Sequence, residues 1–177
     1  MRGPRLRAAM WTCADGMVSK VISGGQTGVD RAALDVAIEL GIPHGGWVPK
    51  GRKAEDGILP RKYHLSEMPT ASYAGRTEQN VLHSDGSLIL SHGELKGGSN
   101  LTRKLAIRHG RPWLRIDLSK TPVFESVRTI QTWLLNEGIR VLNVGGPRGS
   151  EDPDIYRETA NILRKALSPI EPDPPEK

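Results

Sequence analysis

The sequence predicts a single α/β domain with a doubly wound, mainly parallel sheet flanked by helices. Two patterns lead to this prediction. Short β-prone runs alternate along the chain with longer segments whose apolar residues recur at helical spacing. Glycine-rich turns follow several of the predicted strands, and the 177 residues include 20 glycines. Alternation of strands and helices implies parallel strands joined by right-handed crossovers.

The predicted strands are short and rich in Val, Ile and Leu. The first ends at the pair Gly24-Gly25, and the strand that ends at Ser91 is apolar enough to be buried on both faces. The predicted strands cover residues 18–23, 44–48, 87–91, 112–117 and 140–144.

The predicted helices carry their own stop signals. Gly41 follows the first helix and Pro43 blocks its continuation, while Gly138 ends a later helix. The predicted helices cover residues 28–40, 76–84, 100–109, 123–138 and 153–167. Residues 49–72 form a long polar connection between the second strand and the second helix.

The folded unit is expected to span residues 18–167. Residues 1–17 are predicted to be a flexible tail, so that Met17 is an alternative start to Met1. Arg7 and Thr12 interrupt the apolar run that a signal peptide would need. Residues 168–177 hold four prolines and are predicted to be a Pro-rich tail, since proline cannot continue a helix.

Composition excludes several classes of protein. No run approaches the ~20 apolar residues that span a bilayer, so we expect no membrane span. The formal charge is +5, of which residues 21–167 hold +4, but no basic run is interleaved with aromatic residues, which makes nucleic acid an unfavoured partner. A single cysteine, Cys13, cannot form an internal disulfide and is typical of a reducing compartment, so we expect the protein to be cytoplasmic.

The glycine-rich loop over residues 23–31 is the first candidate binding site. It lies between a predicted strand and a helix, where ligands bind in open α/β sheets. Thr27 is expected to be the N-cap, with Asp30 completing a capping-box-like pair. Backbone amides and the helix dipole favour an anion here, with Arg31 as a charge-assisted contact. A tight, capped turn that binds nothing is the alternative.

Three further segments share this character. The loop at 92–102 places Gly97, Gly98 and Ser99 before a predicted helix, and we expect it to face the same cleft as the first loop. The loop at 143–150 supplies Arg148, with Asp152 and Pro153 expected as N-cap and first residue of the last helix. Residues 49–57 are either a solvated charged loop or a lid over the ligand.

Other chemistries lack support in the sequence. The five histidines show no ligand spacing to one another or to Cys13, so no metal site is predicted. A GxSxG nucleophile elbow is missing, and no catalytic residue is predicted.

Arg76 and Asn80 lie on one helical face and either reach a ligand or bridge neighbouring loops.

Several separated motifs together resemble the putative molybdenum carrier family. They are Gly24-Gly-Gln-Thr-Gly-Val-Asp-Arg-Ala-Ala-Leu34, Gly45-Gly-Trp-Val-Pro-Lys-Gly-Arg52 with Ala54-Glu-Asp-Gly57, Arg76-Thr77 with Asn80, and Leu142-Asn-Val-Gly-Gly-Pro-Arg148. That family is similar in turn to the lysine-decarboxylase-like proteins, which include the LOG cytokinin-activating hydrolases and the DNA-processing protein DprA. The resemblance covers about residues 18–167.

The resemblance implies a Rossmann-like fold, a homodimer or homotetramer, and a cleft for a nucleotide or other phosphate-bearing anion, or for molybdenum cofactor. Molybdoenzymes would then be the acceptors of that cofactor. Together with the loops themselves it gives one set of candidate binding residues. These are Gly24, Gly25, Gln26, Thr27, Gly28, Asp30, Arg31, Lys50, Arg76, Gly97, Gly98, Ser99, Thr102, Gly146 and Arg148.

One departure from the LOG hydrolases affects the expected activity. Their PGGxGTxxE signature ends in a catalytic glutamate, whereas the segment from Gly97 to Lys104 keeps the glycines and has no glutamate at its end. A carrier that binds its ligand without changing it is therefore the leading hypothesis. A nucleotide-processing hydrolase that uses Asp30 or a lid carboxylate, and a nucleotide-sensing module, are the alternatives.

Overall fold

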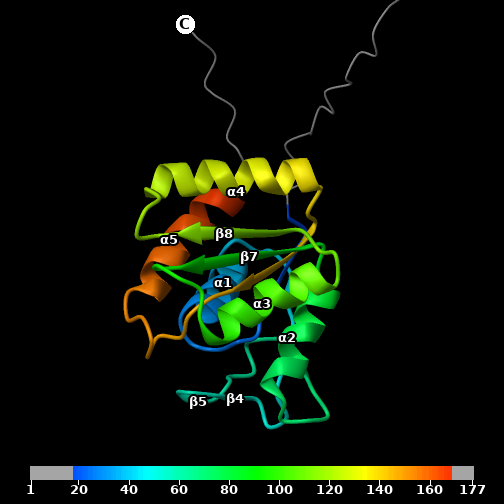
Figure 1. The fold of residues 1–177 in the computed structure, drawn as a ribbon. Coiled ribbons are helices and arrows are strands. Elements are labelled where there is room, and N and C mark those ends of the chain that lie inside the picture. Colours follow the sequence, from blue (N-terminus) through cyan, green and yellow to red (C-terminus); the bar gives the residue numbers. More distant parts are fainter. Residues whose placement is uncertain (1–17, 169–177) are drawn as a thin grey trace, which may run out of the picture.

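The computed structural model describes residues 18–168, and the N-terminal tail predicted over 1–17 and residues 169–177 of the C-terminal tail lie outside them. At the centre is a five-stranded parallel sheet in the order β2-β1-β9-β7-β8 (Figure 1). Its strands are β1 (Lys20–Ile22), β2 (His44–Gly45), β7 (Gly86–Ser91), β8 (Trp113–Asp117) and β9 (Val141–Gly145).

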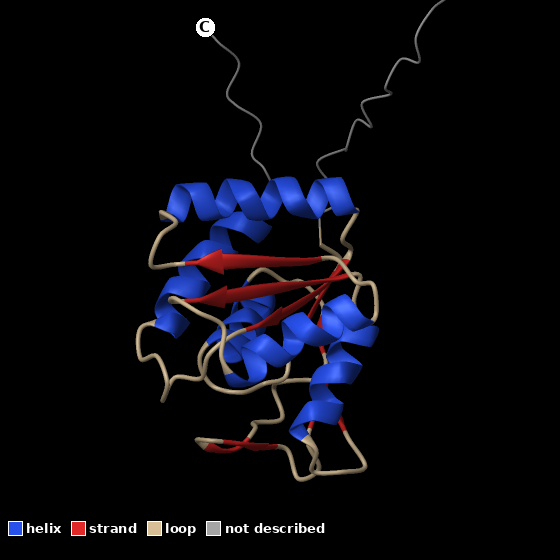
Figure 2. Cartoon of the chain, in the orientation of Figure 1, coloured by secondary structure: helices blue, strands red, loops and turns tan. Residues whose placement is uncertain are grey.

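Five helices surround this sheet (Figure 2). They are α1 (Val29–Glu39), α2 (Tyr73–Leu82), α3 (Gly97–Arg108), α4 (Val123–Glu137) and α5 (Ile155–Leu167). Helices α1 and α5 pack together on one face of the sheet, with α4 against α5 and β8, while α2 and α3 pack together on the other face. Parallel strands with helices on both faces confirm the predicted Rossmann-like, doubly wound class.

Alternating side chains of the inner strands divide the core between the two faces. Leu88 and Leu90 of β7 and Leu142 of β9 are fully buried in the core that α1, α4 and α5 cover. Neighbouring residues on these strands point to the opposite face. There the buried Asn143 of β9 donates a hydrogen bond of 2.9 Å from Nδ2 to Oγ of Ser87 on β7. That second face carries polar groups toward α2 and α3.

The polar connection after β2 is more structured than the sequence predicted. The strand expected over 44–48 divides at Gly46, whose φ of +129° is a conformation that favours glycine. Its second half, β3 (Trp47–Val48), leaves the main sheet and pairs in parallel with β6 (Ser66–Glu67), while β4 (Lys53–Ala54) and β5 (Gly57–Ile58) form a hairpin. A small core of Leu34, Val48, Leu59, Tyr63 and Leu65 supports this segment.

Helix starts account for most of the other differences from prediction. Gly28, not Thr27, is the N-cap of α1, and no side chain of the described residues caps it. Helix α2 begins at Tyr73 behind the N-cap Ser72, and α3 begins at Gly97, so its glycines form the first helical turn. Asp154 rather than Asp152 is the N-cap of α5. The expectation of Gly138 at the end of α4 is confirmed by its left-handed φ of +63°.

Candidate functional site

A cavity of about 390 Å³ opens at the carboxyl ends of β1 and β9, between α2 and the N-terminus of α3. Strands β9 and β7 are neighbours, but the helices that follow them, α5 and α3, lie on opposite faces of the sheet. Such a topological switch point leaves a crevice beside the strand ends, where open α/β sheets bind ligands. The β1 and β7 loops that we expected from neighbouring strands do not come from neighbours, because β9 lies between β1 and β7.

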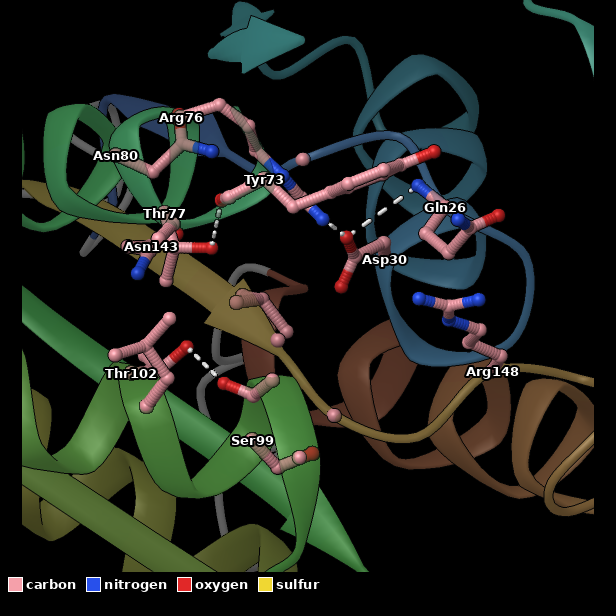
Figure 3. Close-up of a pocket in the computed structure, with 18 of the residues that line it drawn as sticks. Gln26, Asp30, Tyr73, Arg76, Thr77, Asn80, Ser99, Thr102, Asn143 and Arg148 are labelled. Atoms are coloured by element: carbon pink, nitrogen blue, oxygen red, sulfur yellow. Dashed lines mark hydrogen bonds and ion pairs between the residues drawn. The ribbon is translucent and has the colours of Figure 1, made fainter. Parts of the chain in front are cut away.

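Ten of the predicted residues line this cavity. They are Gly24, Gln26, Asp30, Arg76, Gly97, Gly98, Ser99, Thr102, Gly146 and Arg148. The cavity therefore joins the first glycine loop, the start of α3 and the loop after β9, as Figure 3 shows for the labelled side chains.

The N-terminus of α3 presents unused donors to the cavity. Within the described chain, the backbone N–H groups of Gly97, Gly98 and Ser99 donate no hydrogen bond, and the N-cap Lys96 makes no side-chain cap. The first turn of α3 also contains no acidic residue. Ser99 lines the cavity, is 6% exposed, and its Oγ has no hydrogen-bond partner among residues 18–168. First-turn N–H groups and the helix dipole together favour an anion at this point.

The N-terminus of α1 is partly occupied by groups of the protein itself. Val29 N–H donates to the Pro147 carbonyl at 3.3 Å, and Asp30 places its carboxylate in the first turn of the helix. That carboxylate also accepts a bond of 3.3 Å from the N–H of Gln26. Because a negative group already occupies this helix start, a ligand anion is favoured at α3 instead.

Asp30 and Arg76 form a buried ion pair in the cavity. The distance between Arg76 Nη1 and Asp30 Oδ2 is 3.2 Å, and the two side chains are 14% and 8% exposed. Gly24 leaves room for this pair, because a Cβ on it would collide with Nη1 of Arg76. Burial raises the pKa of Asp30 above its usual value, although Arg76 acts to lower it. The buried Arg76 Nε has no hydrogen-bond partner within residues 18–168, which leaves this cation a donor to spare.

Tyr73 and Arg148 complete the cavity from opposite sides. In Figure 3 the Tyr73 ring lies across the cavity beside Asp30, with Arg148 facing it from the loop after β9. The guanidinium carbons of Arg76 and Arg148 each lie 5.9 Å from the centre of this ring. A planar ring flanked by two cations, beside an open helix N-terminus, is suited to a ligand with both an aromatic and an anionic part.

Comparisons with known proteins show the family of the chain. The model of the circularly permutated YpsA SLOG family matches residues 21–167. The chain belongs to this SLOG family. A crystal structure at 1.45 Å of a putative molybdenum carrier protein from Syntrophus aciditrophicus SB is 52% identical, with a TM-score of 0.85 over 86% of this chain and 97% of that one. No protein with a curated description matches.

Five predicted residues of this SLOG chain lie outside the lining of the cavity: Gly25, Thr27, Gly28, Arg31 and Lys50. Gly25 and Gly28 have left-handed φ angles of +72° and +75°, and added Cβ atoms would collide with Leu59 and Leu65 or with the Pro147 carbonyl. Their role is to shape the turn. Lys50 is exposed in the connection after β3.

Thr27 and Arg31 contact the β4–β5 hairpin and do not line the cavity. The hydroxyl of Thr27 donates to Glu55, whose carboxylate also accepts from Ser150 N–H at 3.1 Å. Arg31 contacts both oxygens of Asp56 at 3.1 Å, and this pairing lowers the pKa of the Asp56 carboxyl. The hairpin is thus tied to the two loops that border the cavity, although no residue between 49 and 57 lines it.

Gln26 links the hairpin to the cavity wall. Its Oε1 accepts from Glu55 N–H at 2.8 Å and from Thr27 N–H at 3.1 Å, while the side chain lines the cavity. The lid hypothesis for residues 49–57 therefore takes a different form. These residues brace the cavity wall from outside.

Several lining residues of the SLOG site lie outside the predicted set of binding residues. Tyr73 lies before the helix predicted over 76–84, and Asn143 and Gly145 lie in the candidate loop at 143–150 but outside the predicted set of binding residues. A usable signal was present for Gly145, since it belongs to the Gly145-Gly146 pair at the end of β9. Asn80 lines the cavity, but its Oδ1 accepts from Trp47 N–H at 2.7 Å, so it also ties α2 to β3.

Asp152, expected to cap a helix, instead binds a histidine in the loop after β7. His92 Nδ1 lies 2.6 Å from Asp152 Oδ2, and its Nε2 lies 3.0 Å from Glu158 Oε2. The hydrogen bond to Asp152 raises the pKa of His92. This contact fixes the loop that leads to the open N-terminus of α3 against α5.

Proposed function

We propose that the protein is a carrier that binds molybdenum cofactor, a pterin with a phosphate and a molybdenum-oxo group, and releases it unchanged. The observation that carries this proposal is the open N-terminus of α3, whose first residues line a cavity with two arginines and an aromatic ring. The similarity to a putative molybdenum carrier protein supports the same ligand.

The lining residues fit the parts of this ligand. The N–H groups of Gly97 to Ser99 would receive the phosphate, because the first turn of a helix favours anions. Arg148 and Arg76, which both line the cavity, would offset the remaining negative charge. The Tyr73 ring would contact the pterin, and a cavity of about 390 Å³ lies in the range of small-molecule sites.

The carboxylates of the cavity favour binding over catalysis. Two of its lining residues carry them, Asp30 and Glu151. Asp30 is paired with Arg76, and Lys104 of α3 stands where the LOG signature has its glutamate. Molybdoenzymes are the proposed acceptors of the cofactor.

One observation supports a second function. Burial raises the pKa of Asp30, which would suit a proton donor in a nucleotide hydrolase. Release of free base from nucleoside monophosphates by the purified protein, lost in Asp30→Asn while the nucleotide still binds, would establish this alternative.

The carrier is tested by anaerobic titration with molybdenum cofactor in a calorimeter, together with mass spectrometry of any ligand that co-purifies. We expect one cofactor bound per chain, and weaker binding of the dephosphorylated pterin. Failure of the cofactor to bind, with tight binding of an ordinary nucleotide, would overturn the proposal.

A further inference from the structure

Asp30 has one oxygen that the protein leaves unused. Its Oδ2 accepts from Arg76 at 3.2 Å and from Gln26 N–H at 3.3 Å, whereas Oδ1 accepts no hydrogen bond from residues 18–168. The side chain is only 8% exposed and lines the cavity. A desolvated carboxylate oxygen without a donor is costly, and the raised pKa of Asp30 is consistent with that cost.

The space in front of this oxygen is kept open by Gly145. A Cβ built on Gly145 would lie 3.7 Å from Asp30 Oδ1 and 3.9 Å from Thr102 Oγ1, so that any side chain there would fill the gap between them. In Figure 3 both oxygens of Asp30 are visible, one bonded to Arg76 and Gln26 and the other turned away from them. The Tyr73 ring borders the same space.

An ionised carboxylate only accepts hydrogen bonds, so it selects groups that donate. The pyrimidine edge shared by guanine and pterin offers adjacent donors, a ring N–H and an exocyclic amino group. The corresponding edge of adenine offers a donor beside a ring nitrogen that is an acceptor. The lone pair of that nitrogen would be repelled by the carboxylate. A buried acceptor therefore discriminates between these edges.

We propose that Asp30 is the specificity residue of this cavity and binds the N–H donor edge of a 2-amino-4-oxo heterocycle, that is, of a pterin or a guanine. The heterocycle then lies at the Asp30 end beside Tyr73, and its phosphate lies at the N-terminus of α3. This inference rests on the proposed function in using the same cavity, but it adds the identity and direction of the heterocycle.

The first test varies the ligand and leaves the protein intact. Calorimetric titration of the full chain with neopterin monophosphate, GMP, IMP and AMP compares edges that differ in their donors. We expect GMP and the pterin to bind at least about tenfold more tightly than AMP, with IMP between them because it lacks the amino group. Equal affinities for GMP and AMP, or no binding of either the pterin or GMP, would overturn the proposal.

The second test varies the protein. Asp30→Asn should reduce the preference for GMP over AMP to within about threefold, because an amide offers both a donor and an acceptor. Asp154→Asn, an exposed site outside the cavity lining, is the matched control and should keep the preference. Since Asp30→Asn leaves Arg76 buried without its partner, the double variant Asp30→Asn with Arg76→Gln removes both charges if the single variant fails to fold. A preference retained in both variants would contradict the assignment.

The outcomes separate this inference from the carrier function. If molybdenum cofactor binds while GMP and AMP are not distinguished, the carrier stands and the role of Asp30 falls. If guanine is preferred while molybdenum cofactor does not bind, the role of Asp30 stands and the carrier falls.

Discussion

Replacing Gly98 with aspartate should weaken ligand binding and at the same time stabilise the folded protein. A Cβ on Gly98 meets no described atom within 4 Å, so the new side chain has room beside the open N-terminus of α3. A carboxylate in the first turn of a helix stabilises it by about 0.3–1 kcal/mol. Leaving glycine adds about 0.3 kcal/mol of helix propensity. For a chain of this size we therefore expect a rise in Tm of about 1–5 °C.

The effect on binding follows from charge repulsion. Two unit charges of like sign about 4 Å apart repel by about 4 kcal/mol at an effective dielectric constant near 20. Salt and solvent at the mouth of the cavity reduce this value, so we expect about a 100-fold loss of affinity for GMP or molybdenum cofactor.

Gly98→Asn is the matched control, because it has nearly the same shape without the charge. It should lose less than about tenfold in affinity, and its deficit should not change with salt. Calorimetry at two salt concentrations and a thermal melt without ligand measure both quantities. Equal losses in the two variants, or unchanged binding in Gly98→Asp, would refute an anion site at α3.

Three further predictions follow from the same structure. Gly145→Val should abolish ligand binding in the titration, because the new side chain fills the gap beside Asp30. Little Tm should be lost, since the added Cβ makes only ordinary contacts of 3.7 and 3.9 Å. Intact binding would contradict the placement of the heterocycle. Tyr73→Ala should cost about 1–3 kcal/mol of ligand binding by removing a stacking surface, whereas Tyr73→Phe should bind as the wild type does, because the ring alone is required. His92, held by Asp152 and Glu158, has a raised pKa; its stabilisation is present in full below its unfolded pKa of about 6.5 and is lost as pH rises through the higher folded value. Melts over this pH window should therefore converge for wild type and His92→Gln at high pH, and parallel curves would contradict the charged contact.

The sequence predicted the alternation of strands and helices because that pattern depends on local spacing. Gly138 ends α4 as expected, since a left-handed residue after a helix is a local requirement. The helix starts were less predictable. Thr27 resembles an N-cap in the sequence, but its hydroxyl donates a hydrogen bond to Glu55, 28 residues away. Asp152 likewise bonds to His92, 60 residues away, and does not cap the helix.

The candidate site likewise has features that the sequence predicted and features that it could not predict. Glycine pairs after strands pointed to the loops that border the cavity, because the carboxyl ends of parallel strands share one edge of the sheet. Which glycine faces the cavity could not be predicted, since it depends on tertiary contacts. Gly24 makes room for Arg76, whereas Gly25 faces Leu59 and Leu65 of the small core. The pairing of Arg31 with Asp56 likewise depends on the path of the β4–β5 hairpin.

We propose above that the protein holds molybdenum cofactor and returns it unchanged. The direct measurement is the half-life of the cofactor in air with and without the protein, followed by its transfer to an apo-molybdoenzyme under anaerobic conditions. We predict a longer half-life with the wild type and with Gly98→Asn, no protection by Gly98→Asp, and recovery of the intact cofactor in the acceptor. An unchanged half-life, or a cofactor altered by the protein, would contradict the claim.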